Sequence, residues 1–329
     1  DPLILLEIGR LYFKEGQLKK ARNVFHTVKK TFNLRPSVKE KVNRYLYEIK
    51  HQEGYWTYSF NLINTKNPKR KPVSGIYTIF GIPLQFENRE NKSYLGVNNE
   101  LTFYKKLKRS LNLTSKFNFL DYKGQKFDEQ SIQISLHDEN GISDFSKEYT
   151  FIYDNAQEYK RSSIGARLGY KTNKRFFDLA PSLGFYFTNN SAIGYKEGNR
   201  IDFSVASYTP FADPNSTIYL KYQKENLELE SNSNTSGIIY FEKRLLSSKL
   251  LITPSVKYID TQFDGFDSTW AKKRKDNSYE IKLSFCPQII GIENINSVCL
   301  AWLREKRNSN IQFYNFEEDS FSVNYVQTF

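Results

Sequence analysis

The chain has 329 residues and carries 48 Lys and Arg against 36 Asp and Glu, a formal net charge of +12 at pH 7. Its apolar mass is largely aromatic, with 26 Phe and 23 Tyr but no Met, and such rings are typical of membrane interfaces. The mean hydropathy of -0.62 and the lack of any run of about 18 apolar residues exclude a transmembrane helix but not a transmembrane β-barrel, whose strands need an apolar residue only at every second position.

The first 52 residues have the periodicity of α-helices. Apolar residues recur three or four positions apart on both sides of a "KEGQ" turn and again after Pro36, so we expect a helical hairpin and a third helix. The small and aromatic residues Gly9, Tyr12, Ala21 and Phe25 resemble the packing positions of a tetratricopeptide repeat (TPR), a unit that buries its apolar faces by stacking on neighbouring repeats. A helical hairpin without a recognition role is the alternative for residues 1–52.

From residue 53 to residue 329 the chain alternates apolar and polar residues in segments separated by turn residues, which predicts strands. A further segment, 76–86, contains Gly81 and Pro83 and would make the number of strands odd, so we assign it to a loop. The sequence therefore predicts fourteen strands, at 55–63, 94–107, 110–121, 127–137, 145–154, 162–171, 176–189, 200–208, 216–229, 236–245, 250–261, 277–287, 296–308 and 317–329.

The two faces of these segments favour a membrane barrel over a soluble β-sandwich. In the segment 110–121, Phe117 alternates with Lys116, and in the segment 200–208, Phe203 alternates with Asp202. Charged side chains would destabilise the dry core of a sandwich, whereas a water-filled lumen accepts them. The fold class that we predict is mainly β, a 14-stranded transmembrane outer-membrane β-barrel preceded by a short α-helical TPR-like segment.

The connections between the predicted strands alternate in length, and the two longest, 64–93 and 262–276, belong to the same set. Because outer-membrane barrels have short periplasmic turns and long external loops, we expect these two outside the cell and residues 1–52 in the periplasm. Basic clusters at 69–71 and 272–275 fall in these connections. We interpret them as solvated loop faces, and we expect no nucleic-acid partner.

The last segment is predicted to close the barrel. Phe321, Val323, Tyr325 and Phe329 share one face of an extended strand, and Gln327 interrupts the apolar series. An aromatic C-terminal residue on such a strand resembles the signal read by the outer-membrane assembly machinery, which the resemblance implies as a partner.

Catalytic, cofactor-binding and metal-binding motifs are not found. The sequence lacks a Gly-x-Ser-x-Gly elbow and a phosphate-binding glycine loop, and His26, His51 and His137 do not have ligand spacing. A barrel lipase with His137 in its lumen is the alternative, but a polar lumen residue is the favoured interpretation. We therefore expect no enzymatic activity and no cofactor.

Cys286 and Cys299 flank one short turn on consecutive predicted strands. Each lies on the face opposite the apolar set of its strand, which makes a cross-strand bridge geometrically plausible. In an oxidising periplasm such a pair forms a disulfide, so we predict a structural bond here.

Two stretches resemble the surface lipoprotein assembly modulators: "VKEKVNRYLYEIKHQEGYWTYSFNL" at 38–62 and "NSNIQFYNFEEDSFSVNYVQTF" at 308–329, most closely at Ser309, Asn310, Tyr314 and Phe329. The resemblance implies an outer-membrane translocon that moves surface lipoproteins, or secreted haem-binding proteins, to the cell surface. An outer-membrane barrel is also expected to contact outer-membrane lipids, and binding of lipopolysaccharide or of an acidic partner is the alternative role of the basic clusters at 69–71 and 272–275. The sequence differs from the family pattern because it contains only about one helical repeat, whereas members of the family have several. A TPR-barrel polysaccharide exporter and a passive porin are the alternatives.

Overall fold

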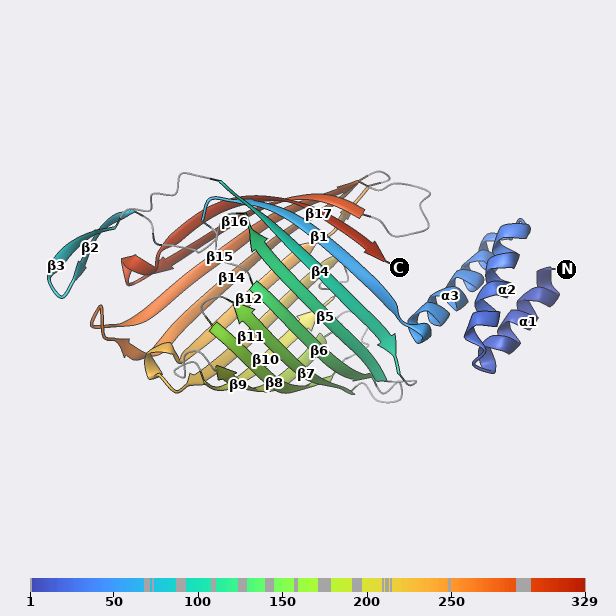
Figure 1. Cartoon of the computed structure of the whole chain (residues 1–329), viewed down its shortest axis with the longest axis horizontal. Coiled ribbons are helices and arrows are strands. Elements are labelled where there is room, and N and C mark those ends of the chain that lie inside the picture. The colour runs from blue at the N-terminus through green and yellow to red at the C-terminus, as the bar shows by residue number, and fades with distance from the viewer. Residues whose placement is uncertain are drawn as a thin grey trace.

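The structure is a computed structural model that describes residues 2–67, 72, 74–86, 93–107, 111–123, 129–139, 145–156, 159–170, 179–190, 197–208, 210, 213, 215–247, 250–287 and 297–328. Within these residues, a helical segment and a β-barrel lie end to end (Figure 1). None of the helices in this part of the chain is both long enough and apolar enough to cross a membrane.

The barrel is one antiparallel sheet that closes on itself. Neighbouring strands follow chain order, β12 pairs with β14, and β1 pairs with β17 to complete the circle. Closure satisfies the backbone hydrogen-bonding groups of every strand, which a lipid environment requires. The fourteen barrel strands are β1 (Tyr55–Thr65), β4 (Tyr94–Lys106), β5 (Leu111–Tyr122), β6 (Glu129–Glu139), β7 (Phe145–Ala156), β8 (Tyr159–Tyr170), β9 (Leu179–Asn190), β10 (Gly198–Ser207), β11 (Ser216–Leu227), β12 (Asn234–Lys243), β14 (Leu250–Asp267), β15 (Lys272–Pro287), β16 (Ser297–Ser309) and β17 (Phe316–Thr328).

Each predicted strand overlaps one of these strands, and the predicted faces are confirmed. On β8, Ile164 and Leu168 are 63% and 55% exposed, while Arg167 between them contacts Asp202. On β10, Phe203 is exposed and Asp202 is completely buried. On these two strands the large apolar side chains therefore point outward and the charged ones point into the lumen, as the part of a barrel in lipid requires.

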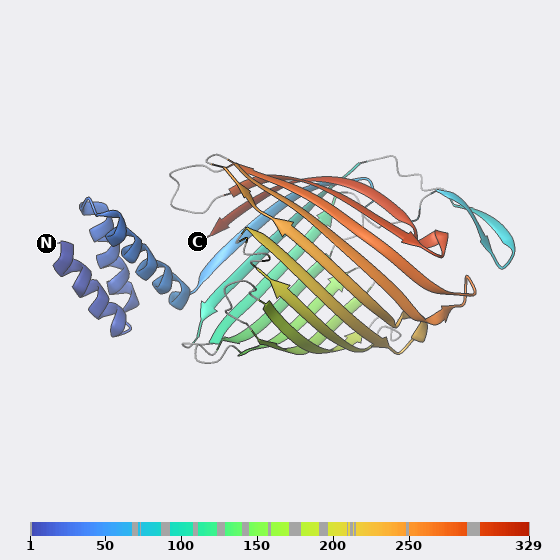
Figure 2. The same cartoon turned by 180° about the vertical axis from the view of Figure 1, so that it is seen from behind.

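The segment 76–86 lies outside the barrel, as predicted, but it forms a two-stranded hairpin and not an irregular loop. Strands β2 (Gly75–Ile79) and β3 (Ile82–Phe86) pair with each other and with no barrel strand among the described residues. Phe80 and Gly81 at the turn have φ angles of 49° and 81°, the positive values of a tight hairpin. Both views place this hairpin at the end of the barrel opposite the helices (Figures 1 and 2).

The prediction of a long loop at 262–276 is wrong. Strands β14 and β15 continue through most of it, and only residues 268–271 form the turn. Their pairing shifts between Gln262 and Phe266. The parts of β14 and β15 beyond residue 261 do not alternate apolar and polar residues over a long stretch. Two paired strands in water satisfy each other's backbone hydrogen bonds and need no apolar face toward lipid. The basic cluster 272–275 consequently lies in β15 and not in a loop, whereas 69–71 lies outside the described residues.

The helical segment has the predicted three helices, α1 (Pro2–Lys14), α2 (Leu18–Thr31) and α3 (Pro36–Glu53). Helix α3 ends at Gly54, where φ is 90° and an added Cβ would lie 3.0 Å from the Phe103 ring. This close approach turns the chain directly into β1. The His51 ring centre then lies 5.0 Å from that of Tyr104 on β4, so the helices contact the barrel.

Candidate functional site in the barrel lumen

The inner wall between β8 and β11 carries a cluster of charges centred on Asp202. Its Oδ2 lies 3.1 Å from Nζ of Lys221 on β11 and 3.8 Å from Nε of Arg200. Its Oδ1 lies 3.4 Å from Nη2 of Arg167 on β8. We call these four residues the Asp202 cluster. A completely buried carboxylate is costly by itself, so the three cations are what make this position tolerable.

Strand β9 lies between β8 and β10, and its residue 184 leaves room for the side chains of Arg167 and Asp202 to contact each other. Arg167, Gly184 and Asp202 occupy one row of the sheet, with the glycine between the other two. A Cβ added to Gly184 would lie 2.7 Å from Oδ1 of Asp202. Glycine at this position therefore opens the space in which the ion pair forms.

Tyr186, also on β9, packs beside the Asp202 cluster. The Arg200 guanidinium lies 4.2 Å from the centre of its ring, within the range of a cation–π interaction. The ring lies across Gly165 on β8, where an added Cβ would be only 2.0 Å from a ring carbon. The aromatic ring therefore holds one guanidinium at a fixed place in the wall.

The Asp202 cluster has a surplus of positive charge. Glu148 lies 4.0 Å from Arg167, which gives two carboxylates against three cations, an excess of one. The Nε atoms of Arg167 and Arg200 are buried and donate no hydrogen bond to any described part of the protein. The surplus charge of the cluster can therefore attract an anion to this part of the inner wall, while the two Nε atoms themselves are out of reach of the lumen.

Hydroxyl pairs make the rest of this inner wall polar. Each pair joins two adjacent strands at an inward-facing row, so the lumen is lined with groups that donate and accept hydrogen bonds. The pairs and their Oγ separations are Ser135–Thr150 at 3.2 Å, Ser163–Thr188 at 3.1 Å, Ser182–Ser204 at 2.7 Å and Ser236–Thr261 at 3.0 Å.

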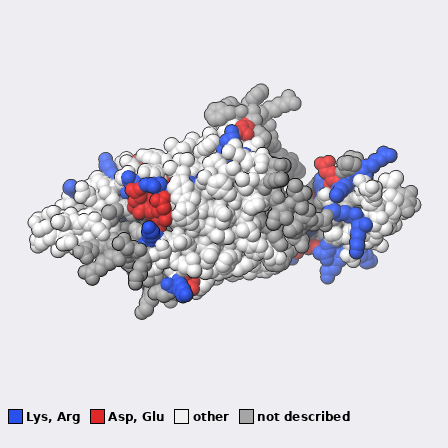
Figure 3. All heavy atoms as spheres, turned by 90° about the horizontal axis from the view of Figure 1, so that it is seen from above, with Lys and Arg blue, Asp and Glu red and all other residues white. Residues whose placement is uncertain are grey.

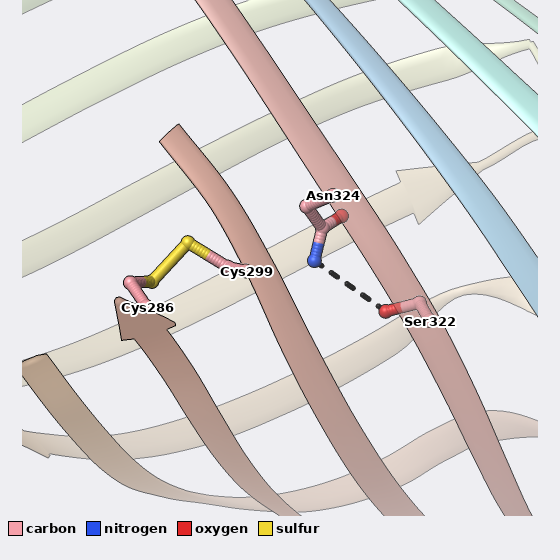
Figure 4. The surroundings of a disulfide bond; sticks show 4 residues. All are labelled: Cys286, Cys299, Ser322 and Asn324. Carbon is pink, nitrogen blue, oxygen red and sulfur yellow. Dashed lines mark hydrogen bonds between the residues drawn. A yellow bond between two sulfur atoms is a disulfide. The ribbon is translucent and has the colours of Figure 1, made fainter. Parts of the chain in front are cut away.

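Cys286 and Cys299 form the predicted disulfide, with an S–S distance of 2.08 Å. Figure 4 shows the bond joining β15 to β16. Cys299 is in register with Asn324 of β17, whose amide donates to Ser322, so the disulfide lies on the inner face. It links two strands close to the place where the barrel closes.

The predicted closing strand is β17, which pairs with β1 from Asn64–Phe321 to Thr57–Thr328. Phe321 and Val323 are exposed on the outer face. Tyr325 is half-buried, and its hydroxyl donates to Oε1 of Gln327 over 3.0 Å. Phe329 lies outside the described residues.

Asn310 and Tyr314, two of the residues that most resemble the modulator family, lie in one turn at the end of the barrel opposite the helices. Asn310 accepts a hydrogen bond from the backbone N–H of Lys275 and donates to the carbonyl of Lys273, both at 2.8 Å. The Tyr314 hydroxyl donates to Asp267 over 2.7 Å. Burial and this hydrogen bond raise the pKa of Tyr314 to about 12. These residues therefore fix the shape of this end of the barrel, where the Phe313 ring also contacts Tyr77 of the β2–β3 hairpin.

The four TPR-like residues come together in the helical segment. Ala21 and Phe25 are completely buried, Tyr12 packs against the same core, and Gly9 lies under Phe25. A Cβ on Gly9 would approach the Phe25 ring to 2.8 Å. The small residue thus allows α1 and α2 to approach each other closely.

The histidines form no shared site among the described residues. His51 makes edge-to-face ring contacts with Tyr55 and Tyr104 at the junction between α3 and the barrel, while His137 lies on β6 and His26 on α2. No group of three potential metal ligands occurs in the part of the chain that the structure covers.

No protein-family model matches the chain, and no curated protein matches it. Solved structures do match, at low sequence identity. Acinetobacter baumannii OccAB4 has a TM-score of 0.50 and 13% identity, over 85% of this chain and 99% of that chain. Pseudomonas aeruginosa OccK1 has a TM-score of 0.46 and 10% identity, over 85% and 100% of the two chains. A KdgM porin in complex with oligogalacturonate has a TM-score of 0.38 and 8% identity, over 83% and 99%. These neighbours are outer-membrane porins, and the likeness shows that the chain has the fold of an outer-membrane barrel.

Proposed function

We propose that this protein moves cargo across the outer membrane and that its barrel provides the route. The observation that carries the proposal is the two-sided wall, which is apolar outside and lined by hydroxyls and charges inside. A soluble binding protein would not expose side chains such as Ile164 and Phe187, which are 63% and 70% accessible.

Within this class, the lumen most directly supports a porin-type channel. The Asp202 cluster supplies a surplus positive charge, which would favour passage of small anions over cations. The fold of the solved porins is consistent with such a channel.

A translocon for surface lipoproteins, or for secreted haem-binding proteins, is a finer proposal. It is supported by the sequence resemblance at 38–62 and 308–329 and by the helical segment, whose Gly9–Phe25 contact matches the close packing of a TPR. In this proposal the helices contact cargo in the periplasm. Their twelve Lys and Arg against five Asp and Glu in residues 2–53 would favour an acidic cargo surface.

The channel proposal is tested by single-channel recording in planar bilayers. We expect a steady conductance that favours anions, and Arg200→Gln should reduce this selectivity. Arg304→Gln on the outer wall is the matched control and should leave it unchanged. Equal selectivity in all three proteins would contradict a role for the Asp202 cluster in conduction.

The translocon proposal is tested by surface labelling of a co-expressed lipoprotein. We expect deletion of this protein to abolish the surface signal and re-expression to restore it. Surface exposure that persists after deletion would rule out the translocon. A closed barrel that conducts poorly but is needed for display would favour the translocon over the porin-type channel.

A further inference from the structure

The β2–β3 hairpin carries an aromatic side chain at a strained turn. Ile79 pairs with Ile82, so Phe80 and Gly81 form a two-residue turn. Their φ angles of 49° and 81° have the positive sign that a type I′ turn requires at both positions. Asn and Gly are the residues that such turns prefer, whereas a bulky side chain at positive φ is unfavourable. The strained turn holds Phe80 at the tip of the hairpin, where it is 77% exposed.

One face of the hairpin packs against two turns at the end of the barrel opposite the helices. Tyr77 is buried, and its ring centre lies 5.4 Å from that of Phe313, in the turn between β16 and β17. The ring centre of Phe86 lies 5.8 Å from Phe313. Trp270, in the turn between β14 and β15, lies 5.3 Å from the same ring. These contacts anchor the hairpin at the rim of the barrel.

The remaining surface of the hairpin is apolar and carries no charge of its own. Ile76 is 69% exposed, and Ile82 and Leu84 are also exposed. Residues 72–86 contain no Asp, Glu, Lys or Arg, although these residues make up 26% of the chain. A charged group placed on this surface would lose hydration without gaining an opposite charge from the hairpin. The surface therefore fits an uncharged, partly apolar partner.

The hairpin lies beyond the reach of membrane lipid. The outer face of the barrel becomes charged at Arg304 on β16 and at its partner Asp319 on β17. Residue 312, where the anchoring turn begins, follows Arg304 by eight positions. At about 3.3 Å per residue and a strand tilt of about 40°, the turn lies roughly 20 Å farther from the membrane centre. Figure 3 shows one patch of red and blue spheres on the barrel and mainly white ones at the left tip, where the hairpin lies. Acyl chains therefore do not cover the hairpin.

The two edges of the hairpin differ in the backbone groups that they offer. Because the pair Ile79–Ile82 closes the turn, the alternation of an antiparallel ladder directs the N–H and C=O groups of Ile76 and Thr78 away from β3. On β3 one outward position is Pro83, which has no N–H, and proline protects an edge strand from further pairing. No other described strand pairs with β2. The outer edge of β2 can therefore accept a further strand.

An extended polypeptide is the occupant that such an edge selects. A polypeptide backbone has donors and acceptors that match the spacing along β2, and alternate side chains can contact the apolar hairpin. A folded protein has already paired most of its backbone groups, whereas a chain that leaves the barrel in an extended state has not. The position of the hairpin at the rim brings its open edge to the place where such a chain emerges.

We propose that the outer edge of β2 binds an uncharged, extended segment of the exported polypeptide and adds it to the hairpin as a third strand. The proposal rests on the translocon function, in which the helices are periplasmic and this end of the barrel faces outward. The added strand holds the emerging chain at the rim and opposes its return into the lumen. Since β2 has five residues, the bound segment is equally short.

The direct test measures binding of a fluorescent peptide of alternating threonine and valine to the full chain in detergent micelles. Thr78→Pro removes an outward N–H from the edge and should weaken binding at least tenfold, about 1.4 kcal/mol. Thr78→Ser keeps this N–H and is the matched control, with unchanged affinity. Ile76→Lys, which places a charge beside the edge, is a second variant that should also weaken binding. The same peptide with every second backbone nitrogen methylated keeps its side chains and should not bind.

The outcomes separate the strand site from the translocon. Equal binding of the methylated peptide would overturn the strand edge, as would unchanged affinity in both Thr78→Pro and Ile76→Lys. In cells, a photoreactive residue at position 76 should crosslink to a co-expressed lipoprotein during its display. Crosslinks to a second copy of this protein, or to lipopolysaccharide, in place of the lipoprotein would overturn the choice of occupant. Peptide binding together with display that persists after deletion of the protein would retain the strand site and reject its role in export.

Discussion

Two parts of the barrel wall gather charges of both signs, and they differ in what surrounds those charges. In the lumen, the Asp202 cluster surrounds a carboxylate that has no solvent contact. On the outer face, Arg304 and Lys306 pair with carboxylates that remain more than a third exposed. Removing one partner of a buried ion pair lowers the free energy of unfolding strongly, whereas an exposed ion pair contributes little to it. The ion pairs of the Asp202 cluster are therefore needed for a stable fold, whereas those of the outer face can be replaced with little loss of stability.

The largest effect is expected for Asp202→Asn, which leaves three partly exposed cations around a buried, uncharged amide. Removing one partner of a buried ion pair costs about 3–5 kcal/mol in unfolding free energy. Denaturant unfolding, followed by the mobility shift of the folded barrel on unheated gels, measures this. Asp319→Asn on the outer face should cost no more than about 1 kcal/mol. An equal decrease in unfolding free energy for Asp202→Asn and Asp319→Asn would contradict this difference between the buried and the exposed charges.

A smaller effect is expected for a charge placed on the lipid face. Phe117→Arg should destabilise the barrel by about 2–4 kcal/mol, because arginine enters the hydrocarbon layer. Asn118→Arg is its control on the same strand, since residue 118 faces the lumen in register with Glu100. Folded yield in the outer membrane and thermal stability provide the measurement. Similar tolerance at both positions would contradict the assignment of the two faces.

The disulfide should contribute up to about 3 kcal/mol, as its short loop predicts in the chain-entropy picture. Replacing Cys286 and Cys299 by serine should lower the denaturant midpoint of the oxidised protein to that of the reduced one. Alkylation of unreduced, denatured protein is the control. Two freely reactive thiols there would show that the bond does not form.

The smallest effect is expected at the junction between the helices and the barrel. Burial lowers the pKa of His51, and neighbouring Lys106 and Lys50 lower it further while Glu48 opposes them. The undocked histidine, with an ordinary pKa of about 6.5, therefore binds protons first as the pH falls. Docking of α3 should be strongest above this value and weaken below it.

Hydrogen exchange of α3 at about pH 7.5 and pH 5.5 measures this change. His51→Gln cannot gain the proton in this range, so its exchange should differ less between the two pH values. A pH effect of the same size in His51→Gln would assign it to another group, such as Glu48, which lies 3.8 Å from Lys106.

The sequence alone determined the number of barrel strands, the face of each side chain and the disulfide. The alternation of Phe117 with Lys116 repeats every two residues, so it assigns inside and outside without knowledge of the neighbouring strands. Cys286 and Cys299 were also predictable, since a hairpin brings its two strands together. The limits of β14 and β15 were not, because beyond the membrane their pairing no longer needs apolar residues.

Only the tertiary structure decided which charges meet. Alternation places Arg167 and Asp202 in the lumen, but it does not show that they lie in one row with Gly184 between them. That row depends on the register of three strands. Register is set when every strand pairs with two neighbours and the sheet closes, so it is a property of the whole barrel and not of any single segment.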